Sequence, residues 1–372
     1  MHLHHNTKEP PKIVLSGTPL EIGLQHGAQL RAQIESQLSV YRTMFQYTSK
    51  LSWDAVLDLA GEFRTTIARL TPELLEEMQG IADGAGVTLL DIIALNCRSE
   101  ISFGKFSDGC TSLSLHRSGR GRILAQNWDF TTQLQNHLAM VEIIQPGKPV
   151  IYMVTEAGLV GKIGFNSAGV GVCLNAIRAH PCLSSKLPIH LALRLCLESV
   201  SVEAALERLS ALGGVASSQH ILIADRTAAL GLELSPLGDD HLPEDEYGVV
   251  THTNHFLVNR RVIEPPWLSG SPVRLARVRA LLREIVGSGV LEDESANMVG
   301  TVLRDQIFSD TCDGPQSICW QEDPAQPEIV RTATLFNIVM RLEEEEGALG
   351  AEVVFGRPGS GMESSVNRMP WR

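Results

Sequence analysis

The strongest constraint on the fold is a series of short β-type segments in the middle of the chain, with no helix between one and the next. Apolar and β-branched residues dominate these segments, which lie at residues 110–117, 122–130, 137–145, 149–157, 159–167 and 169–177. Glycine or proline marks most of the junctions. Short connections join antiparallel neighbours, whereas parallel strands need a crossover of about a dozen residues or more. The series therefore predicts antiparallel sheets and disfavours a doubly wound parallel sheet.

Helical periodicity precedes this series and returns after it. Residues 21–45 repeat apolar positions every three or four residues, Ser52 and Thr71 are suitable starts for two further helices, and residues 89–101 continue the pattern. Later helices are expected at residues 187–199, 201–212, about 272–286 and about 293–304, and later strands at 220–225, 228–234, 247–253, 334–343 and 350–356. Because helices and strands are grouped, an α+β fold with one continuous core is predicted.

Composition restricts the classes of partner. The 372 residues are 44% hydrophobic and 20% charged, as in an ordinary globular protein. A net charge of −12 without a Lys/Arg run argues against nucleic acid and favours small molecules. The least polar long stretch, residues 150–177, is interrupted by Glu156 and Lys162, whereas a membrane helix needs about 20 continuous apolar residues. No membrane partner is therefore predicted.

The ends of the chain and its cysteines bear on location and cofactors. The N-terminal residues lack an apolar signal region, and the end Met369-Pro370-Trp371-Arg372 does not match a peroxisomal tripeptide, so a cytoplasmic protein is expected. The seven cysteines are scattered without a CxxC spacing, which predicts mostly reduced thiols. The histidines of THTNH at 251–255 have no identifiable third ligand. Neither a metal nor a permanently bound cofactor is predicted.

Cys110 is the candidate nucleophile. It begins a β-type segment directly after the turn-forming pair Asp108-Gly109. Gly109 can adopt conformations closed to other residues, so a strained Gly109–Cys110 peptide is expected, open to attack by the Cys110 sulfur on the preceding carbonyl. Such an N-to-S acyl shift followed by hydrolysis frees the α-amine of Cys110. The sequence therefore suggests self-cleavage at this bond.

A free α-amine at Cys110 would supply its own general base. The amine titrates near about pH 8 and can accept the thiol proton without a histidine. The alternative is an inert buried thiol at the start of a strand, and free cysteine is often buried in this way. If only the hexapeptide around Cys110 is considered, a buried inert thiol is the more common explanation of such a short motif.

Longer motifs extend the comparison beyond this hexapeptide. They are GTPLEIGLQHG (17–27), LLDIIALNCRSEISFG (89–104), DGCTS (108–112), AQNWDF (125–130), TEAGLVGKIGFNSAGVGV (155–172), HLALRLCLES (190–199), THTNH (251–255), SIC (317–319) and ATLFNI (333–338). In this order they resemble, nearly end to end, the acyl-coenzyme A:6-aminopenicillanate acyltransferase (isopenicillin-N N-acyltransferase) family of N-terminal-nucleophile hydrolases.

The resemblance implies both a fold and a maturation. The fold is a four-layer αββα sandwich of antiparallel sheets. Cleavage would turn a zymogen into a small, mostly helical subunit, residues 1–109, and a large catalytic subunit, residues 110–372, that begins with Cys110. The two fragments are expected to stay together as a heterodimer in one integrated fold.

Three further catalytic residues are implied by the resemblance. Asp129, in NWDF, is expected to lie near the Cys110 amine, because it ends the second strand of the hairpin that Cys110 opens. Arg331, in VRTATLF, is expected to pair with Asp129 and keep it ionised. Asn254 is expected to donate its amide NH₂ to the oxyanion of the tetrahedral intermediate. The alternatives are a surface ion pair for the two charged residues and a turn after a strand for Asn254.

Other positions bear on the acyl pocket. Asn175, in CLNAI, is a second candidate pocket amide, although tight strand packing explains its surroundings equally well. The chain departs from the penicillin enzyme at Val330 in place of a serine, Trp320 in place of an arginine and Thr131 in place of a phenylalanine. These departures predict an altered acyl pocket.

The predicted function is a self-processing cysteine amidohydrolase/acyltransferase. An acyl group from acyl-coenzyme A, a co-substrate, or from a penicillin-type amide would form a thioester on Cys110 and pass to water or to 6-aminopenicillanate, as in penicillin biosynthesis. The alternatives are an amidase or peptide hydrolase for another small amide, and an uncleaved paralogue without catalysis. The presence of Cys110, Asp129, Asn254 and Arg331 together argues against the last.

Overall fold

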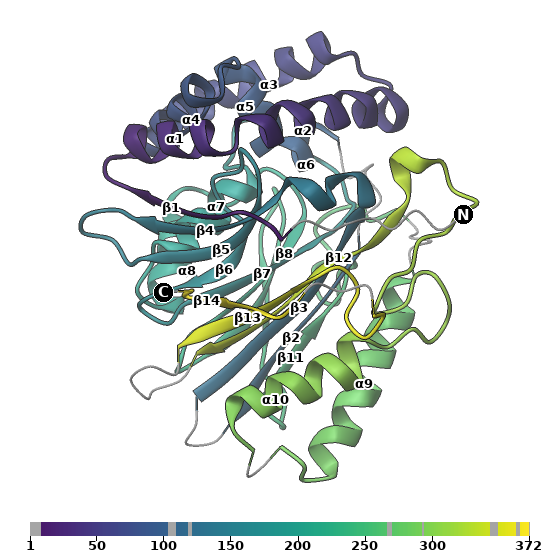
Figure 1. Ribbon diagram of the computed structural model, residues 1–372. Helices are drawn as coiled ribbons and strands as arrows, with labels where there is room; N and C mark the ends of the chain where they lie inside the picture. The colour runs from purple at the N-terminus through teal and green to yellow at the C-terminus, as the bar shows by residue number, and fades with distance from the viewer. Residues whose placement is uncertain are drawn as a thin grey trace.

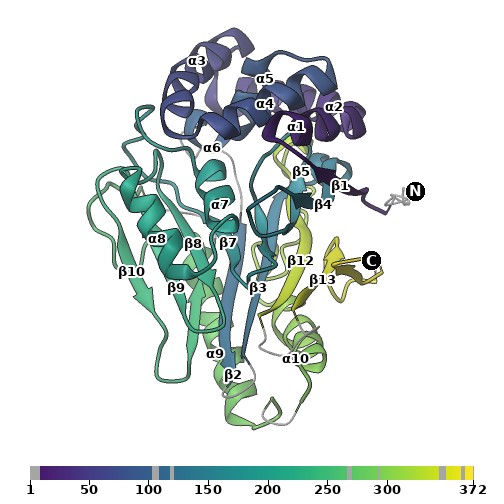
Figure 2. The same cartoon turned by 90° about the vertical axis from the view of Figure 1, so that its left-hand side faces the viewer.

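Two β-sheets packed face to face form the centre of the molecule. The computed structural model describes residues 9–102, 109–117, 121–265, 270–291, 294–342, 349–361 and 365–371. Helices cover the outer face of each sheet, and a further group of helices from the N-terminal part of the chain lies across one end of the sandwich (Figures 1 and 2). Within the described residues, this is the α+β sandwich of two sheets that the sequence predicts.

The first sheet has eight strands. In spatial order they are β1 (Lys12–Ser16), β4 (Leu138–Ile144), β5 (Ile151–Glu156), β6 (Ile163–Asn166), β7 (Gly171–Ala176), β8 (Gln219–Ala224), β9 (Ala229–Leu234) and β10 (Asp240–Pro243). Strands β4 to β7 come from the predicted series, and each pairs antiparallel with the next. The edge pair of β1 and β4 is parallel, which corrects the expectation of purely antiparallel sheets. The helices between β1 and β4 provide the long crossover that a parallel pair requires.

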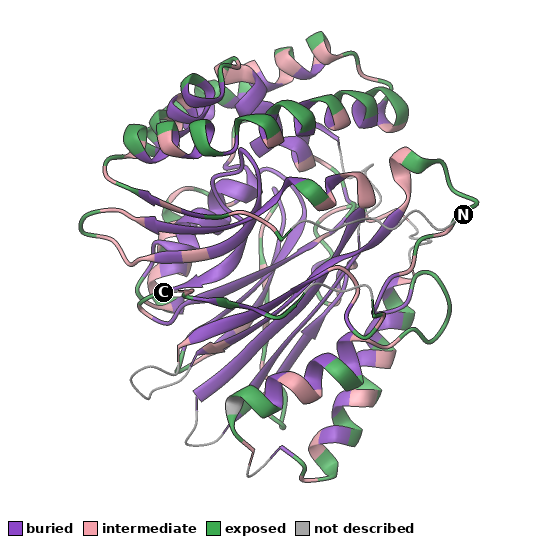
Figure 3. Ribbon diagram, viewed as in Figure 1, coloured by how far each residue is buried: buried purple, intermediate pink, exposed green. Residues whose placement is uncertain are grey.

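The second sheet has six strands and holds the residues of the predicted cleavage site. Their order is β11 (Val249–His252), β2 (Gly109–Arg117), β3 (Gly121–Thr131), β12 (Thr332–Leu342), β13 (Gly350–Phe355) and β14 (Asn367–Met369). All neighbours are antiparallel. Strands β2 and β3 form the predicted hairpin, and Figure 3 shows that the strands of both sheets are mostly buried.

The helices form three groups. The N-terminal group is α1 (Pro19–Gln29), α2 (Arg31–Met44), a π-helix (Phe45–Ser49), α3 (Trp53–Leu70), α4 (Pro72–Ala85), α5 (Leu89–Asn96) and α6 (Arg98–Ile101). Helices α7 (Ile189–Leu197) and α8 (Val202–Ala211) cover the first sheet, and α9 (Ser271–Gly287) and α10 (Ala296–Leu303) cover the second. Short 3₁₀ helices span Thr132–His137 and Glu328–Val330, and a second π-helix spans Arg304–Phe308. Asp293, the predicted start of α10, lies outside the described residues.

Glycines allow α1 and α4 to cross at very short range. Gly23 and Gly27 lie one turn apart on α1 and face Gly80 and Gly84 on α4. A Cβ on Gly23 would lie 2.0 Å from the carbonyl oxygen of Glu77, so the backbones themselves are in contact. The glycines of the motif EIGLQHG therefore serve the packing of the N-terminal helices.

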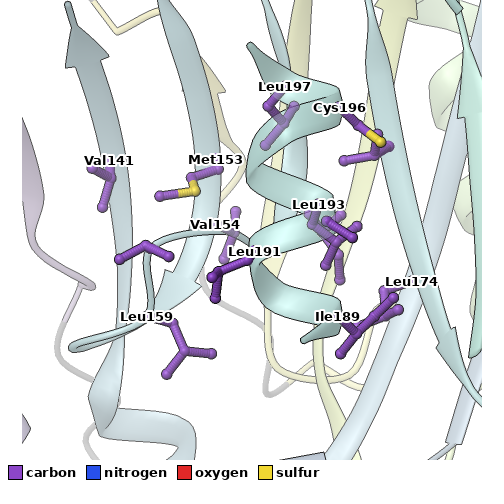
Figure 4. Close-up of a cluster of buried hydrophobic side chains, with 14 of the residues drawn as sticks. Val141, Met153, Val154, Leu159, Leu174, Ile189, Leu191, Leu193, Cys196 and Leu197 are labelled. Atoms are coloured by element: carbon purple, nitrogen blue, oxygen red, sulfur yellow. The ribbon is translucent and has the colours of Figure 1, made fainter. Parts of the chain in front are cut away.

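The largest hydrophobic core lies between the sheets and under the helices of the first sheet. In Figure 4 the apolar residues of α7, among them Leu191 and Leu193, lie next to Val154 of β5 and Leu174 of β7. The same core includes residues on both sides of the predicted cut, as its members Ile34 and Val141 illustrate. In the described part of the chain, no helix has the length and apolarity needed to cross a membrane.

Candidate active site

Cys110 is the second residue of β2 and is 1% exposed. It lies directly opposite Trp128 of β3, and Gly109 lies opposite Asp129. Ser107 and Asp108, which complete the predicted turn before the cut, lie outside the described residues. The two strands therefore place Asp129 next to the Gly109–Cys110 peptide.

Gly109 does not have the special backbone conformation on which the expectation of strain is based. Gly109 is part of β2 and does not have the positive φ that only glycine adopts readily. Its role is to leave space, because a Cβ at this position would lie 2.5 Å from Cζ3 of the Trp320 ring. The ring of Trp320 thus packs directly on the backbone at the predicted cleavage site.

Asp129 is fully buried beside this backbone. Its Oδ1 accepts a hydrogen bond of 2.6 Å from the Thr334 hydroxyl, and its Oδ2 is 2.9 Å from the position that a Cβ on Gly109 would take. The Thr334 hydroxyl in turn accepts a hydrogen bond of 2.9 Å from the backbone NH of Trp320. Thr334 therefore fixes both the carboxylate and the tryptophan, a contribution that the sequence did not indicate.

Arg331 does not pair with Asp129 in this structure. Its guanidinium donates to the backbone carbonyls of Gln326, at 2.8 Å, and Pro324, at 3.2 Å. The strand register explains the difference, because Thr334 lies directly opposite Asp129 and Arg331 precedes the first residue of β12. The predicted ion pair is replaced by the Thr334–Asp129 hydrogen bond.

Asn254 contacts Cys110, but through its carbonyl oxygen. Its Oδ1 accepts from the backbone NH of Cys110 at 2.9 Å, and its Nδ2 donates to the carbonyl of Ala176 at 3.0 Å. The backbone NH of Asn254 donates to the Ser271 hydroxyl at 2.8 Å. The NH₂ group therefore donates one of its two hydrogens to a carbonyl, and the atom of Asn254 that contacts Cys110 is its oxygen and not the NH₂ group expected to bind an oxyanion.

Arg274 is a residue of this site that the sequence analysis missed. Its Nη1 donates to the carbonyl of Cys110 at 2.6 Å and its Nη2 donates to Oδ1 of Asn254 at 2.8 Å. The guanidinium also lies 5.5 Å from the centre of the Trp320 ring. A signal was present, since Arg274 is four residues before Val278 on the buried stripe of α9.

Asn175 and Thr131 have other partners. Oδ1 of Asn175 accepts from the Ser112 hydroxyl at 2.7 Å and is 3.0 Å from Nδ1 of His220, so Asn175 connects β7 to β2 and β8. The Thr131 hydroxyl donates to the carbonyl of Ile329 at 3.2 Å. These contacts favour the packing alternative for Asn175.

A cavity of about 400 Å³ lies beside the Trp320 ring. It is lined by Asp313, Pro315, Gln316, Trp320, Asp323, Gln326, Val330 and Thr332. Trp320 and Val330, two of the positions for which the sequence predicts an altered acyl pocket, both line this cavity, and Trp320 also contacts Gly109. The Trp320 ring therefore connects this cavity to the backbone of the predicted cleavage site.

Comparison with known proteins identifies the family. The model of the acyl-coenzyme A:6-aminopenicillanic acid acyl-transferase family matches residues 116–340, a region that begins after Cys110 and includes Asp129, Asn254 and Arg331. The chain therefore belongs to this family of acyltransferases and is an enzyme.

Individual proteins were also found to be similar. The acyl-coenzyme A:6-aminopenicillanic-acid-acyltransferase 40 kDa form of Emericella nidulans is 34% identical over 360 residues, which are 95% of each chain. Penicillin V acylase from Agrobacterium tumefaciens, a solved structure, has a TM-score of 0.44 at 12% identity and covers 66% of this chain and 83% of its own.

Proposed function

We propose that the chain cleaves itself between Gly109 and Cys110 and then uses Cys110 as the nucleophile of acyl transfer. In the first reaction the sulfur attacks the Gly109 carbonyl carbon, the peptide C–N bond breaks, and the nitrogen takes the thiol proton. Water then hydrolyses the thioester. The products are residues 1–109, ending in a carboxylate, and residues 110–372, beginning with a free α-amine and a free thiol.

The observation that carries this proposal is the contact of two buried side chains with the backbone of Cys110. Oδ1 of Asn254 is bonded to the Cys110 nitrogen and Arg274 to the Cys110 carbonyl. After cleavage the same nitrogen would be an amine that donates one proton to Asn254 and keeps its lone pair for the thiol proton. Such an amine, with a pKa near about 8, is a suitable base at neutral pH.

Five other cysteines are poor alternatives to Cys110 as the nucleophile. Burial raises the pKa of five other thiols, to about 12 for Cys182 and Cys196, to about 11 for Cys319 and well above the usual value for Cys97 and Cys173. A thiol with a raised pKa carries little thiolate and is a poor nucleophile. Cys312 is exposed, and its thiol is the surface control for Cys110 in the experiment below.

Acyl transfer would follow in two steps. The Cys110 sulfur attacks the carbonyl carbon of the donor as its proton passes to the α-amine, and the leaving thiolate or amine takes that proton as the acyl–Cys110 thioester forms. Water or an amine then attacks the thioester carbonyl and gives up a proton to the α-amine, the C–S bond breaks, and the proton passes to the Cys110 sulfur as the acyl product leaves. The family and the relative from Emericella nidulans support acyl-coenzyme A as donor and 6-aminopenicillanate as acceptor. The cavity beside Trp320 is a candidate site for the acyl group.

Self-cleavage is tested by the mass of the freshly purified protein under denaturing conditions. We expect fragments 1–109 and 110–372, with cysteine as the new N-terminal residue. Cys110→Ala should stay whole, Cys110→Ser should cleave slowly because a hydroxyl is the poorer nucleophile, and the surface variant Cys312→Ala should cleave as the wild type does. A wild-type protein that stays whole on prolonged incubation would show that the maturation is wrong.

The acyl-enzyme is tested separately on the cleaved protein. Phenylacetyl- and medium-chain acyl-coenzyme A, with and without 6-aminopenicillanate, should add an acyl mass to the fragment that begins with Cys110 and release free coenzyme A thiol. Prior thiol blocking should abolish both signals. Cleaved protein that shows neither an adduct nor turnover with these thioesters, penicillins or simple amides would contradict the acyltransferase proposal.

A further inference from the structure

A buried cluster of five polar side chains lies behind Cys110 and has no part in the reaction described so far. It consists of Tyr41, Arg98, Glu156, Lys162 and His190, each at most 5% exposed. Glu156 is its centre: Oε1 accepts from the Tyr41 hydroxyl at 2.6 Å, and Oε2 accepts from Arg98 at 2.5 Å and from Lys162 at 2.6 Å. Buried ions of this kind need such partners, because desolvation alone is costly.

Lys162 brings this cluster to the nucleophile. Its ammonium lies 3.4 Å from the centre of the Trp128 ring, a cation–π contact. Trp128 is directly opposite Cys110 in the β2–β3 pair, and side chains that are directly opposed lie on the same face of a sheet. Lys162 is also close enough to Cys110 for the two to interact electrostatically. The ammonium therefore shares the face of the second sheet on which the Cys110 side chain lies.

The charges in the cluster are well defined. Burial would raise the pKa of Glu156, but Arg98 and Lys162 together hold it below its usual value, so Glu156 is ionised. Burial, with Arg98 and Lys162 adding to it, lowers the pKa of His190 well below its usual value, which makes the ring neutral. Arg98 can thus donate to Nε2 of His190, at 2.6 Å, while Nδ1 donates to the carbonyl of Gly161 at 2.9 Å.

Burial also acts on the lysine itself. It lowers the pKa of Lys162 to about 8, while Glu156 acts in the opposite direction and Arg98 adds to the lowering. Without the Glu156 carboxylate, the ammonium would lose its principal stabilising partner. Tyr41 and Arg98 hold that carboxylate, and Arg98 Nε also donates to the Tyr41 oxygen at 2.6 Å.

The cluster joins the two sides of the proposed cut. Tyr41 and Arg98 precede Gly109, whereas Glu156, Lys162 and His190 follow Cys110. The hydrogen bonds and the ion pair that fix Glu156 therefore run between the two fragments that cleavage would produce. Residues 1–109 thus contribute contacts to the surroundings of the nucleophile and not only to the hydrophobic core.

We propose that Lys162 is a positioning residue whose ammonium stabilises the thiolate of Cys110, and that Tyr41 and Arg98 of the N-terminal fragment hold it there through Glu156. The proposal rests on Cys110 being the nucleophile of the proposed function. Lys162 neither gains nor loses a proton in the reaction: the thiol proton passes to the Cys110 α-amine, and Lys162 only favours the charged form of the sulfur.

Other charged or titratable groups also lie near Cys110 and influence the pH at which its thiol ionises. Arg274, from α9, contacts its carbonyl, Asp129 lies one position further along β3, and Cys173, from β7, interacts with it electrostatically. Burial raises the pKa of Cys173, so Cys173 is a neutral thiol near neutral pH. A variant of Lys162 leaves these three groups in place.

The experiment measures, as a function of pH, the rate at which iodoacetamide alkylates Cys110. The adduct is detected by the mass of the proteolytic peptide that contains Cys110. Lys162→Met introduces a neutral side chain of similar length. In this variant the midpoint of the plot of alkylation rate against pH should move to higher pH, and the alkylation rate at neutral pH should fall by about tenfold. That is the change in thiolate fraction for a rise of about one unit in the pKa of the Cys110 thiol. Lys162→Arg keeps the charge and should recover part of the rate.

A matched lysine and a milder variant make the result specific. Lys148, which is paired with Glu198, lies away from the cluster, and Lys148→Met should leave the profile unchanged. Tyr41→Phe deletes one hydrogen bond to Glu156 and should move the midpoint in the same direction by less; Tyr47→Phe, at an exposed tyrosine, is its control. Tyr41→Phe decides the question if Lys162→Met does not fold.

Two outcomes would overturn the proposal: coinciding pH profiles for the wild type, Lys162→Met and Tyr41→Phe, or equal effects of the Lys162 and Lys148 variants. Failure of the proposed function is a separate result, because it would appear as wild-type protein that is not cleaved or not acylated. Alkylation of Cys110 can be followed in either the whole or the cleaved chain.

Discussion

Replacing Gly109 by alanine should show how tightly the cleavage site is packed. An ideal Cβ at this position lies 2.5 Å and 2.6 Å from two carbons of the Trp320 ring and 2.9 Å from Oδ2 of Asp129. Carbon atoms in contact are normally about 3.5–4.0 Å apart, so the ring would have to move by about 1 Å. Overpacking of this kind costs about 1–3 kcal/mol, and we expect that loss in the free energy of unfolding.

The measurement is denaturant unfolding in the Cys110→Ala background, where the chain should stay whole and cleavage cannot affect the result. The control is Gly61→Ala in α3, where an added Cβ meets nothing within 4 Å. Because alanine is the better helix former, the control should gain about 0.5–1 kcal/mol. The two glycines therefore predict effects of opposite sign for the same chemical change.

A second variant identifies the cause. Trp320→Leu removes the ring that the new methyl group would strike, so Gly109→Ala should cost less than about 1 kcal/mol in that background. Contacting residues that share a clash are expected to be non-additive in this way. If Gly109→Ala behaves as Gly61→Ala does, or if its cost is the same with and without Trp320, the close packing inferred at the cleavage site is refuted.

Three further predictions concern the site, the reaction and pH. Asp129→Asn should slow cleavage or turnover far more than Arg331→Ala, and the two effects should add in a double-mutant cycle, because the structure keeps these residues apart. With acyl-coenzyme A, hydrolysis should be easier to detect than transfer to 6-aminopenicillanate, since only transfer needs a bound amine held in place; efficient transfer without hydrolysis would contradict this. Burial, with a smaller contribution from Arg194, lowers the pKa of His26 to about 4. The unfolded chain therefore binds the proton first, and lowering the pH from about 6.5 to about 4 should remove about 3 kcal/mol of unfolding free energy. The loss should be smaller in His26→Gln, and equal acid sensitivity of the two proteins would exclude His26 as the cause.

Much of the fold could be predicted because its elements repeat a clear pattern. Strands β4 to β7 and helix α9 lie where apolar periodicity and glycine placed them. The edge strand β10 was missed because it has only four residues, of which two are exposed. The parallel partner of β4 was missed because β1 is more than a hundred residues away in sequence, and local pattern carries no information on such a pairing.

The residues of the candidate site likewise include some that the sequence predicted and some that it did not. The motifs brought Cys110, Asp129 and Asn254 together correctly, but which atom of Asn254 faces Cys110 depends on donors from other segments. Arg274 was missed because arginine on a helix usually points to solvent, although here it is 1% exposed. Lys162 was noticed only as an interruption of an apolar stretch. Its partner Glu156 is held by Tyr41 and Arg98, which come from helices whose packing the sequence did not reveal.

The orientation of Asn254 constrains how the tetrahedral intermediate can be stabilised. Two donors, the Cys110 backbone NH and Nη2 of Arg274, converge on its Oδ1, and an amide turned the other way would set its NH₂ group against both of them. The carbonyl of Ala176 fixes the NH₂ group at the other end. Asn254 is thus suited to hold the nitrogen of Cys110 before and after cleavage, and in this arrangement it can serve an oxyanion only through the second hydrogen of Nδ2, the one that Ala176 does not accept.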